Sequence, residues 1–169
     1  MADTDTWLFL DTQEEETTAV YKEVVDILQD LGKEEYLDHV VAQIYHMQEY
    51  DKIKKVYPFK AWCFQLYKVR PLQLKWEVYE TVAEFCEKNG IGMVCISKSR
   101  PTRKLCKLFH DHGLLVGVHP VNGKKKERKF HSMGVDFIMT DKLYYNSAIT
   151  MAISNERTSQ GRKNEKRTG

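Results

Sequence analysis

The sequence VHPVNGKKKERKFHSMGVDFIMTD, residues 118–141, contains two short apolar segments separated by a piece long enough for one helix. The first segment ends in His-Pro-Val-Asn, and the second, Gly-Val-Asp-Phe-Ile-Met, ends in Thr-Asp. Short apolar runs bounded by turn residues are typical of buried strands. The stretch therefore predicts a strand, a helix and a second strand, with polar residues where each strand ends.

The same alternation extends through the rest of the chain. Helices are expected between successive strands because apolar residues recur there at helical spacing. The predicted strands are 7–11, 40–45, 61–67, 93–97, 114–119 and 135–140, and the predicted helices are 14–31, 48–56, 74–89, 101–112, 124–133 and 142–153. Strict alternation favours a parallel sheet with helices outside it and right-handed connections.

Two of the predicted helices carry specific signals. Pro101 stands where the first turn of the 101–112 helix tolerates proline, and Gly113 stands where that helix should end. The 14–31 helix carries an apolar stripe of Val20, Val24, Val25, Ile27, Leu28 and Leu31.

Length and composition indicate one globular domain. The chain has 169 residues, of which 42% are hydrophobic, enough to bury a core. Its formal charge of +2 is too small to indicate a nucleic-acid or membrane partner by itself. The four cysteines form no CxxC pair, so buried reduced thiols are expected rather than a metal site or disulfides.

No membrane-spanning segment or signal peptide is evident in the sequence. No apolar run approaches the roughly 18 residues that would span a bilayer, and the first residues, MADTDTW, lack the features of a signal peptide. A cytoplasmic location is therefore the default expectation.

Polar residues cluster at the carboxyl ends of the predicted strands. In barrels and open α/β sheets this end carries the functional site. The residues concerned are Asp11, Gln13, Gln43, Tyr45, Gln65, Tyr67, Lys68, Ser97, Lys98, His119, Asn122, Thr140 and Asp141.

Individually these side chains leave alternatives open. Asp11 suits a divalent cation or a helix cap. Lys68 suits a phosphate or solvent, and His119 suits acid–base chemistry although no carboxylate partner is evident in the sequence. Asn122 suits the orientation of either a turn or a ligand.

Residues 114–141 resemble the closing part of bacterial glycerophosphodiester phosphodiesterases. In that family the penultimate strand ends in (Trp/His)-Thr-(Val/Ile)-Asn, and Gly-Val-Asp-Gly-Ile-x-Thr-Asp follows a helix. Here residues 119–122 read His-Pro-Val-Asn and residues 134–141 read Gly-Val-Asp-Phe-Ile-Met-Thr-Asp. Pro120 thus replaces a threonine and Phe137 a frequent glycine.

Upstream segments extend the resemblance to roughly residues 6–145. The segment VVAQIYHMQEYDKIKKVYPFKAWCFQLYK, residues 40–68, is similar to the middle strands of the branch found in low-GC Gram-positive bacteria. The segment WLFLDTQEEETTAVYKEVV, residues 7–25, is similar to the preceding strand, whose end often reads Asp-Thr-Lys or Glu-x-Lys. Gln13 occupies the position of that lysine.

The resemblance implies a (β/α)₈ barrel fold. It also implies the activity of a phosphoric diester hydrolase in lipid metabolism. Such enzymes use calcium or magnesium and a pair of histidines to release glycerol 3-phosphate and an alcohol. It implies a metal ligand at Asp11, and a cleft for a glycerophosphodiester or another phosphate-containing small molecule formed by Gln13, Gln43, Tyr45, Gln65, Tyr67, Lys68, His119 and Asn122.

The family's early motifs are missing. The chain contains no His-Arg-Gly, and the Glu-x-Asp metal ligands and second catalytic histidine precede the matched region in the family. We therefore expect an incomplete TIM-type barrel of about six strand–helix units. We expect this chain to be inactive alone, and the divalent cation of the family can be absent from it. Six parallel strands leave open edges, so a fragment lacking its N-terminal half, self-association and an adapted open sheet are all possible.

The sequence also suits functions other than phosphodiester hydrolysis. A non-catalytic module that binds a phosphate ligand or a protein is the alternative. The partial barrel is expected over residues 1–153, and a disordered basic tail over 154–169. Nucleic-acid binding through this tail is less favoured, since no recognisable motif accompanies its charges. The basic run 124–129 is expected to be a solvated helix face, with attraction to phosphate or an anionic membrane surface as the sharper alternative.

Overall fold

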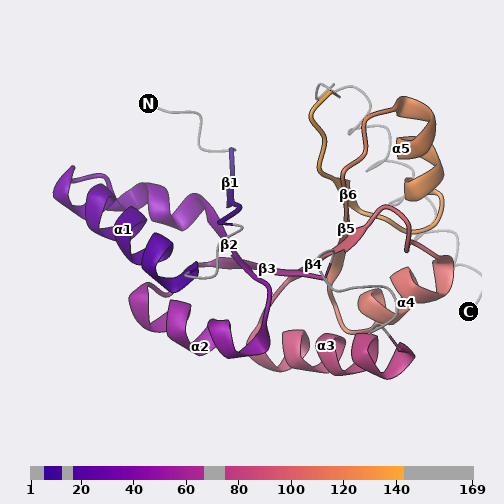
Figure 1. Cartoon of the computed structure of the whole chain (residues 1–169), viewed down its shortest axis with the longest axis horizontal. Coiled ribbons are helices and arrows are strands. Elements are labelled where there is room, and N and C mark those ends of the chain that lie inside the picture. Colours follow the sequence, from indigo (N-terminus) through magenta and orange to yellow (C-terminus); the bar gives the residue numbers. More distant parts are fainter. Residues whose placement is uncertain (1–5, 13–16, 67–74, 143–169) are drawn as a thin grey trace, which may run out of the picture.

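The computed structural model describes residues 6–12, 17–66 and 75–142. Six strands form one parallel sheet in the order β1-β2-β3-β4-β5-β6 (Figure 1). The strands are β1 (Leu8–Leu10), β2 (Val40–Ile44), β3 (Ala61–Gln65), β4 (Met93–Ser97), β5 (Leu115–His119) and β6 (Phe137–Ile138). The predicted incomplete barrel of six parallel units is confirmed.

Five α-helices and one 3₁₀ helix connect the strands. They are α1 (Thr17–Asp30), η1 (Glu34–His39), α2 (Met47–Val56), α3 (Trp76–Asn89), α4 (Arg103–Asp111) and α5 (Lys124–His131). Within the described residues, every helix is too short or too polar to span a bilayer. The predicted helix 142–153 and the tail 154–169 lie outside the described residues, apart from Lys142.

Some predicted boundaries were wrong. The helix expected from Pro101 begins at Arg103, because Thr102 is its N-cap and accepts a hydrogen bond from the Leu105 amide at 3.1 Å. Pro101 therefore precedes the helix rather than filling its first turn. Strand β6 is only two residues long, and η1 was not predicted.

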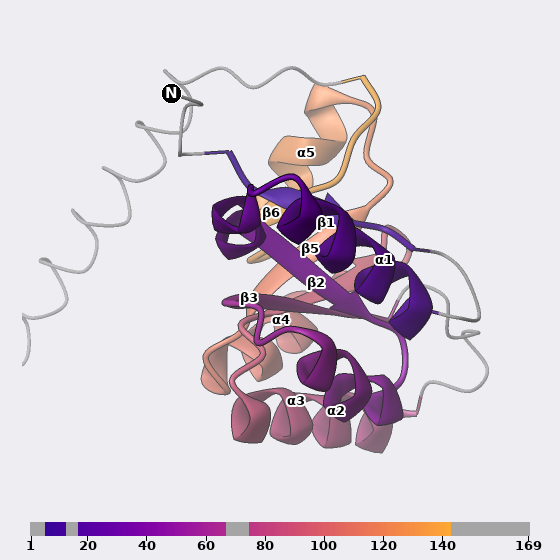
Figure 2. The same cartoon turned by 90° about the vertical axis from the view of Figure 1, so that its left-hand side faces the viewer.

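The convex face of the curved sheet carries the main core. Successive strand residues point to opposite faces, and one set packs under the helices that surround the outside of the curve (Figures 1 and 2). Fully or almost fully buried members of this set include Ala42, Ile44, Phe64, Val94, Ile96, Val116 and Val118. This apolar face holds the helices against the sheet.

The buried face of α1 includes part of the apolar stripe, because Val25 is buried and the half-buried Val24 and Leu28 pack against the core. Thr17, Tyr21 and Val25 are its buried residues, whereas Ile27 is 50% exposed. Leu31 lies past the end of the helix and is 63% exposed. Tyr21 was missed because its polar hydroxyl does not mark it as a core residue in the sequence.

The concave face has a smaller apolar cluster. Val41, Cys63 and Cys95 are buried there and contact the half-buried Phe9 and Phe137. The rings of Phe9 in β1 and Phe137 in β6 lie 6.0 Å apart, centroid to centroid, so the first and last strands meet through side chains across the curve. All four cysteines are buried with free thiols, as predicted for Cys63, Cys86, Cys95 and Cys106.

Gly117 accommodates the ring of Phe137. The two residues are register neighbours in β5 and β6, and a Cβ atom on Gly117 would lie 2.2 Å from the Phe137 ring. The missing side chain at position 117 provides the space for the Phe137 ring.

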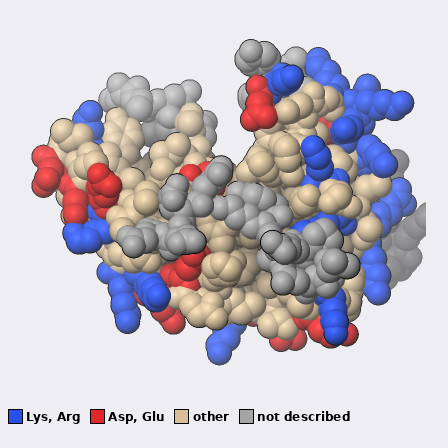
Figure 3. All heavy atoms as spheres, in the orientation of Figure 1, with Lys and Arg blue, Asp and Glu red and all other residues tan. Residues whose placement is uncertain are grey.

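The sheet is open between β1 and β6. Each of these strands has one hydrogen-bonded neighbour among the described strands, and Figure 3 shows a notch between the two sides of the molecule. Trp7 and Leu8, beside this opening, are 45% and 55% exposed. The described strands thus form part of a barrel wall without closing it.

Candidate functional site

The predicted cleft residues of β2, β3 and β5 share the concave face. Gln43 and Gln65 each lie two residues beyond a member of the concave cluster, so they point to the same side. Tyr45 follows Gln43 by the same interval, and His119 follows Gly117. The fold therefore gathers these side chains at the carboxyl end of one face.

Asp11 and Tyr45 meet at the ends of β1 and β2. The Tyr45 hydroxyl donates a hydrogen bond to the Asp11 carboxylate across 34 residues of sequence. Tyr45 is 7% exposed, whereas Asp11 is exposed. The carboxylate is therefore oriented by a neighbouring strand and remains open to solvent.

Gln43 and Gln65 form a buried amide pair on β2 and β3. The Gln65 Nε2 group donates to Gln43 Oε1, and the two residues are 0% and 2% exposed, Gln65 being the more buried. Gln65 Oε1 has no hydrogen-bond partner within the described part of the chain. A buried acceptor left unpaired is costly, so this oxygen marks a place for a hydrogen-bond donor.

Tyr21 supports this pair from α1. Its hydroxyl accepts a hydrogen bond from the Gln43 backbone amide at 2.6 Å. Burial raises the pKa of the Tyr21 hydroxyl, so the group stays protonated.

Glu49 is a second supporting residue that the sequence interpretation missed. Its Oε2 accepts hydrogen bonds from the backbone amides of Tyr45 at 2.6 Å and His46 at 3.0 Å. Its Oε1 accepts a 3.5 Å hydrogen bond from the Thr17 hydroxyl. The signal that could have revealed it is a glutamate three residues after the N-cap of α2, which is a common position for such a contact.

Asn122 orients the end of β6. Its Oδ1 accepts hydrogen bonds from the Thr140 hydroxyl at 3.1 Å and the Asp141 amide at 3.0 Å. Its Nδ2 donates to Asp141 Oδ2 at 3.1 Å. Of the two predicted roles for Asn122, the structure thus supplies the orientation of a turn.

The loop after β4 contacts the carboxyl ends of both neighbouring strands, β3 and β5. The Lys98 amide donates to the His119 carbonyl at 3.1 Å. Arg100, which was not predicted, donates from Nη1 to the Leu66 carbonyl at 2.7 Å, just beyond β3. Three further predicted cleft residues, Gln13, Tyr67 and Lys68, lie outside the described residues.

The described residues do not supply a complete divalent-cation site. Calcium and magnesium require several converging oxygen ligands. Within residues 6–12, 17–66 and 75–142, no group of three or more His, Cys, Asp or Glu side chains could hold a metal ion. Asp11 stays a predicted single ligand.

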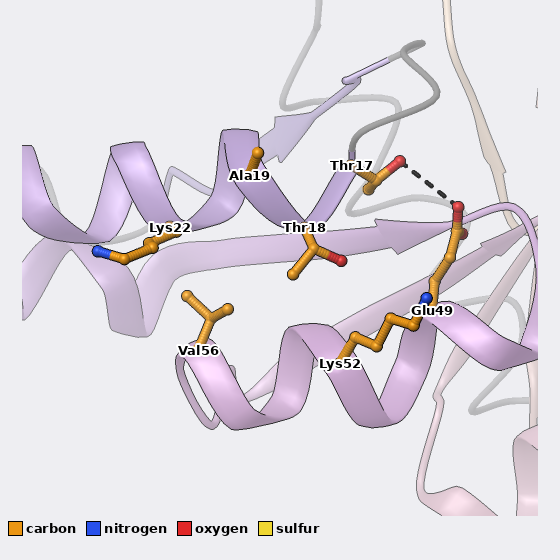
Figure 4. A pocket seen from close by; sticks show the side chains of 7 residues that line it. All are labelled: Thr17, Thr18, Ala19, Lys22, Glu49, Lys52 and Val56. Atoms are coloured by element: carbon orange, nitrogen blue, oxygen red, sulfur yellow. Dashed lines mark hydrogen bonds between the residues drawn. The ribbon is translucent and has the colours of Figure 1, made fainter.

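A separate cavity lies between α1 and α2, on the helical side of the sheet. Its volume is about 490 Å³ and it is lined by Thr17, Thr18, Ala19, Lys22, Glu49, Lys52 and Val56 (Figure 4). None of the predicted cleft residues lines it. It therefore does not belong to the carboxyl-end site, although Glu49 contacts both.

Comparison with solved structures decides the fold. A protein assigned as a glycerophosphoryl diester phosphodiesterase from Silicibacter pomeroyi DSS-3 superimposes with a TM-score of 0.59 at 21% identity, over 80% of this chain and 47% of that one. The chain has the fold of part of a glycerophosphodiester phosphodiesterase. A protein assigned as a glycerophosphodiester phosphodiesterase from Galdieria sulphuraria superimposes with a TM-score of 0.62 at 17% identity, over 79% of this chain and 53% of that one.

A third structure carries a ligand. It is an Oleispira antarctica phosphodiesterase in complex with the product sn-glycerol-3-phosphate, with a TM-score of 0.55 and 15% identity, over 82% of this chain and 50% of that one. The chain spans about half the length of these structures, and the predicted resemblance is confirmed at the level of the fold. No family model and no curated protein matches the sequence.

Proposed function

We propose that the concave carboxyl end of the sheet binds a glycerophosphodiester or its sn-glycerol 3-phosphate portion. The observation that carries the proposal is the convergence there of Asp11 with Tyr45 and of Gln43 with Gln65, from three different strands. The phosphodiesterase fold and the Oleispira antarctica complex with sn-glycerol-3-phosphate support the same ligand class.

The chemistry of these side chains suits a small polyol phosphate. The carboxylate of Asp11, an exposed residue, is an acceptor for ligand hydroxyl groups. His119 ends β5 and Lys98 follows β4, and their side chains would supply hydrogen-bond donors or positive charge to a phosphate. Hydroxyl recognition would thus fall to the end of β1 and phosphate recognition to β4–β5.

We further propose that these residues bind without hydrolysing. Metal-assisted phosphodiester cleavage requires a cation held by several oxygen ligands and a positioned acid and base. The sequence contains no His-Arg-Gly motif of the kind found in glycerophosphodiester phosphodiesterases, and over residues 6–12, 17–66 and 75–142 Asp11 belongs to no group of three or more metal-ligating side chains. Binding is therefore expected to be the same in calcium, in magnesium and in EDTA.

Calorimetric titration of the full chain with sn-glycerol 3-phosphate tests the binding. We expect saturable binding that weakens about tenfold in Asp11→Asn, because one charge-assisted hydrogen bond contributes about 1.5–3 kcal/mol. Asp51→Asn removes the same charge from the exposed surface of α2 and should bind normally. Equal effects of the two substitutions, or no binding, would remove the carboxyl-end site from the proposal.

A hydrolysis assay tests the second part separately. Glycerophosphocholine is incubated with the chain in calcium or magnesium, and released glycerol 3-phosphate is measured against a heat-treated control. We expect no release above the control. Release would show that the chain completes a catalytic site without the family's early motifs.

A protein-interaction role is the second candidate. It is favoured by the exposure of Trp7 and Leu8 beside the open edge of β1, since unpaired edges and exposed apolar side chains promote association. Light scattering after gel filtration tests it with Leu8→Lys. If this edge mediates self-association, that substitution should lower the mass in solution to 19.9 kDa, the mass of one chain.

A further inference from the structure

The net charge of +2 conceals a strong separation of charge along the chain. Residues 6–92 contain 10 Lys and Arg but 16 Asp and Glu, whereas residues 93–142 contain 11 Lys and Arg but only 4 Asp and Glu. The acidic part forms β1–β3 and their helices, and the basic part forms β4–β6 with α4 and α5. Figure 3 shows the Lys and Arg atoms gathered along the side of the molecule formed by α4 and α5.

We call this side the basic face. It consists of exposed side chains on two helices that follow the neighbouring strands β4 and β5. Its members are Arg103, Lys104, Lys107, Lys124, Lys125, Lys126, Arg128 and Lys129.

Within the described residues, the Lys and Arg side chains of α5 form no ion pairs with carboxylates. Lys22, Lys60 and Lys107 form ion pairs with carboxylates, and none of these three residues belongs to α5. Glu127, the acidic residue of α5, is half-buried, while the five basic residues of the same helix are exposed. The helix therefore presents five positive charges to its surroundings.

The positive charges in the first turn of α5 are electrostatically unfavourable at that end of the helix. Lys124, Lys125 and Lys126 stand at the amino end of the helix, where the backbone dipole repels cations. The N-cap Gly123 provides no side-chain hydrogen bond to this end. Packing does not require lysine here, because all three side chains are exposed. An external anionic surface would relieve this repulsion.

The amount and chemistry of the charge indicate the kind of surface. One phosphodiester carries a single negative charge, so five exposed cations on an eight-residue helix suit a partner with many anionic groups. Single-stranded nucleic acid would also need exposed aromatic rings for stacking. On this face Phe130 is 8% exposed, and the Lys104 ammonium covers the Trp76 ring at 4.1 Å from its centroid.

We propose that the basic face binds the surface of a membrane rich in acidic phospholipids. The contact is electrostatic adsorption rather than insertion, because the apolar Phe130 of α5 is turned into the core. Since α5 begins two residues after Asn122, adsorption would bring the carboxyl end of β5 close to the lipid headgroups. The proposal stands independently of ligand binding at that end.

Vesicle co-sedimentation of the full chain tests it. The chain is mixed with vesicles of phosphatidylglycerol and phosphatidylcholine, or of phosphatidylcholine alone, in 0.05 or 0.5 M NaCl. We expect binding to the acidic vesicles at low salt, and loss of most of it at high salt. Each Lys or Arg near such a surface strengthens binding about fivefold, so the combined Lys124→Ala, Lys125→Ala and Lys126→Ala variant should bind about 100-fold more weakly.

A matched control removes the same charge elsewhere. Lys52, Lys54 and Lys55 are exposed on α2, far from α5 in both ribbon views (Figures 1 and 2). Their combined alanine variant should bind acidic vesicles within about threefold of the unchanged chain. Circular dichroism verifies that both variants fold.

Four results would overturn the proposal. They are failure to bind acidic vesicles, equal binding to both kinds of vesicle, equal weakening by the two triple variants, and tighter binding of a single-stranded DNA homopolymer than of acidic vesicles. The last result would assign the face to nucleic acid instead.

Discussion

The two faces of the sheet differ in what covers them. The convex face is apolar along its whole length and is packed under five α-helices. The concave face is apolar around Val41, Cys63 and Cys95 but becomes polar at the strand ends with Gln43 and Gln65. We infer that the convex face stabilises this partial barrel, whereas the polar strand ends of the concave face are available for a ligand site.

The largest expected effect is loss of a convex core side chain. Ile44 is 0% exposed in the main cluster, and Ile44→Ala should lower the free energy of unfolding by about 2–5 kcal/mol. Urea denaturation measures this loss. A loss below about 1 kcal/mol would mean that the convex core is not the main source of stability.

A matched pair of valines sharpens the comparison of the faces. Val94 is on the convex face and Val41 on the concave face, and they are 0% and 2% exposed. We expect Val94→Ala to cost more than Val41→Ala, because Val94 belongs to the large main core whereas Val41 belongs to a small cluster whose fewer neighbours constrain it less. Equal losses in urea denaturation would contradict the unequal roles of the two faces.

Gly117→Ala should destabilise the protein by about 1–3 kcal/mol through overpacking. The new methyl group would lie 2.2 Å from the Phe137 ring unless the ring moves. In a double-mutant cycle, adding Phe137→Leu should recover part of this loss, because a smaller side chain frees the space. Additive losses would show that the two residues do not compete for it.

Asn122→Ala tests the polar connection between the ends of β5 and β6. Three hydrogen bonds are lost, and since Asn122 is exposed we expect a cost of about 1–2 kcal/mol in urea denaturation. Asn89→Ala is the control, because the Asn89 side chain donates one hydrogen bond, to the Phe85 carbonyl at 2.8 Å. It should cost less than Asn122→Ala, and the reverse order would make the Asn122 contacts unimportant.

The smallest effect concerns the thiols. Burial raises the pKa of Cys95 to about 12, and that of Cys106 to about 11. The reactive thiolate is therefore scarce, and labelling with Ellman's reagent should stay slow from pH 7 to pH 9 in the folded protein. All four thiols should react promptly in denaturant. Fast stoichiometric labelling of the folded chain at pH 8 would show that the cysteines are accessible.

The sequence predicted the repeating features of the fold better than its long-range contacts. Strand β4 was placed at its observed bounds, because Met93–Ser97 is a short apolar run between a glycine-rich turn and a polar loop. The pairing of Gly117 with Phe137 could not be predicted, since it depends on how two strands are brought into register.

The candidate site was predicted in part for similar reasons. Polar residues at strand ends are visible in the sequence, and Gln43, Tyr45 and Gln65 indeed share a face. Tyr21 and Arg100 were missed because each contacts backbone that is distant in the sequence, whereas Glu49 had a local signal, its place three residues after the N-cap of α2. The contacts of Tyr21 and Arg100 are defined by tertiary packing and not by local pattern.

The most direct test of the central claim is a two-dimensional ¹H–¹⁵N NMR titration of the chain with sn-glycerol 3-phosphate. We expect saturable shifts of backbone amides at the carboxyl ends of the strands, around Tyr45, Leu66, Lys98 and His119. Shifts confined to the α1–α2 cavity around Thr18 and Lys52, or no shifts at all, would contradict a ligand site on the concave face.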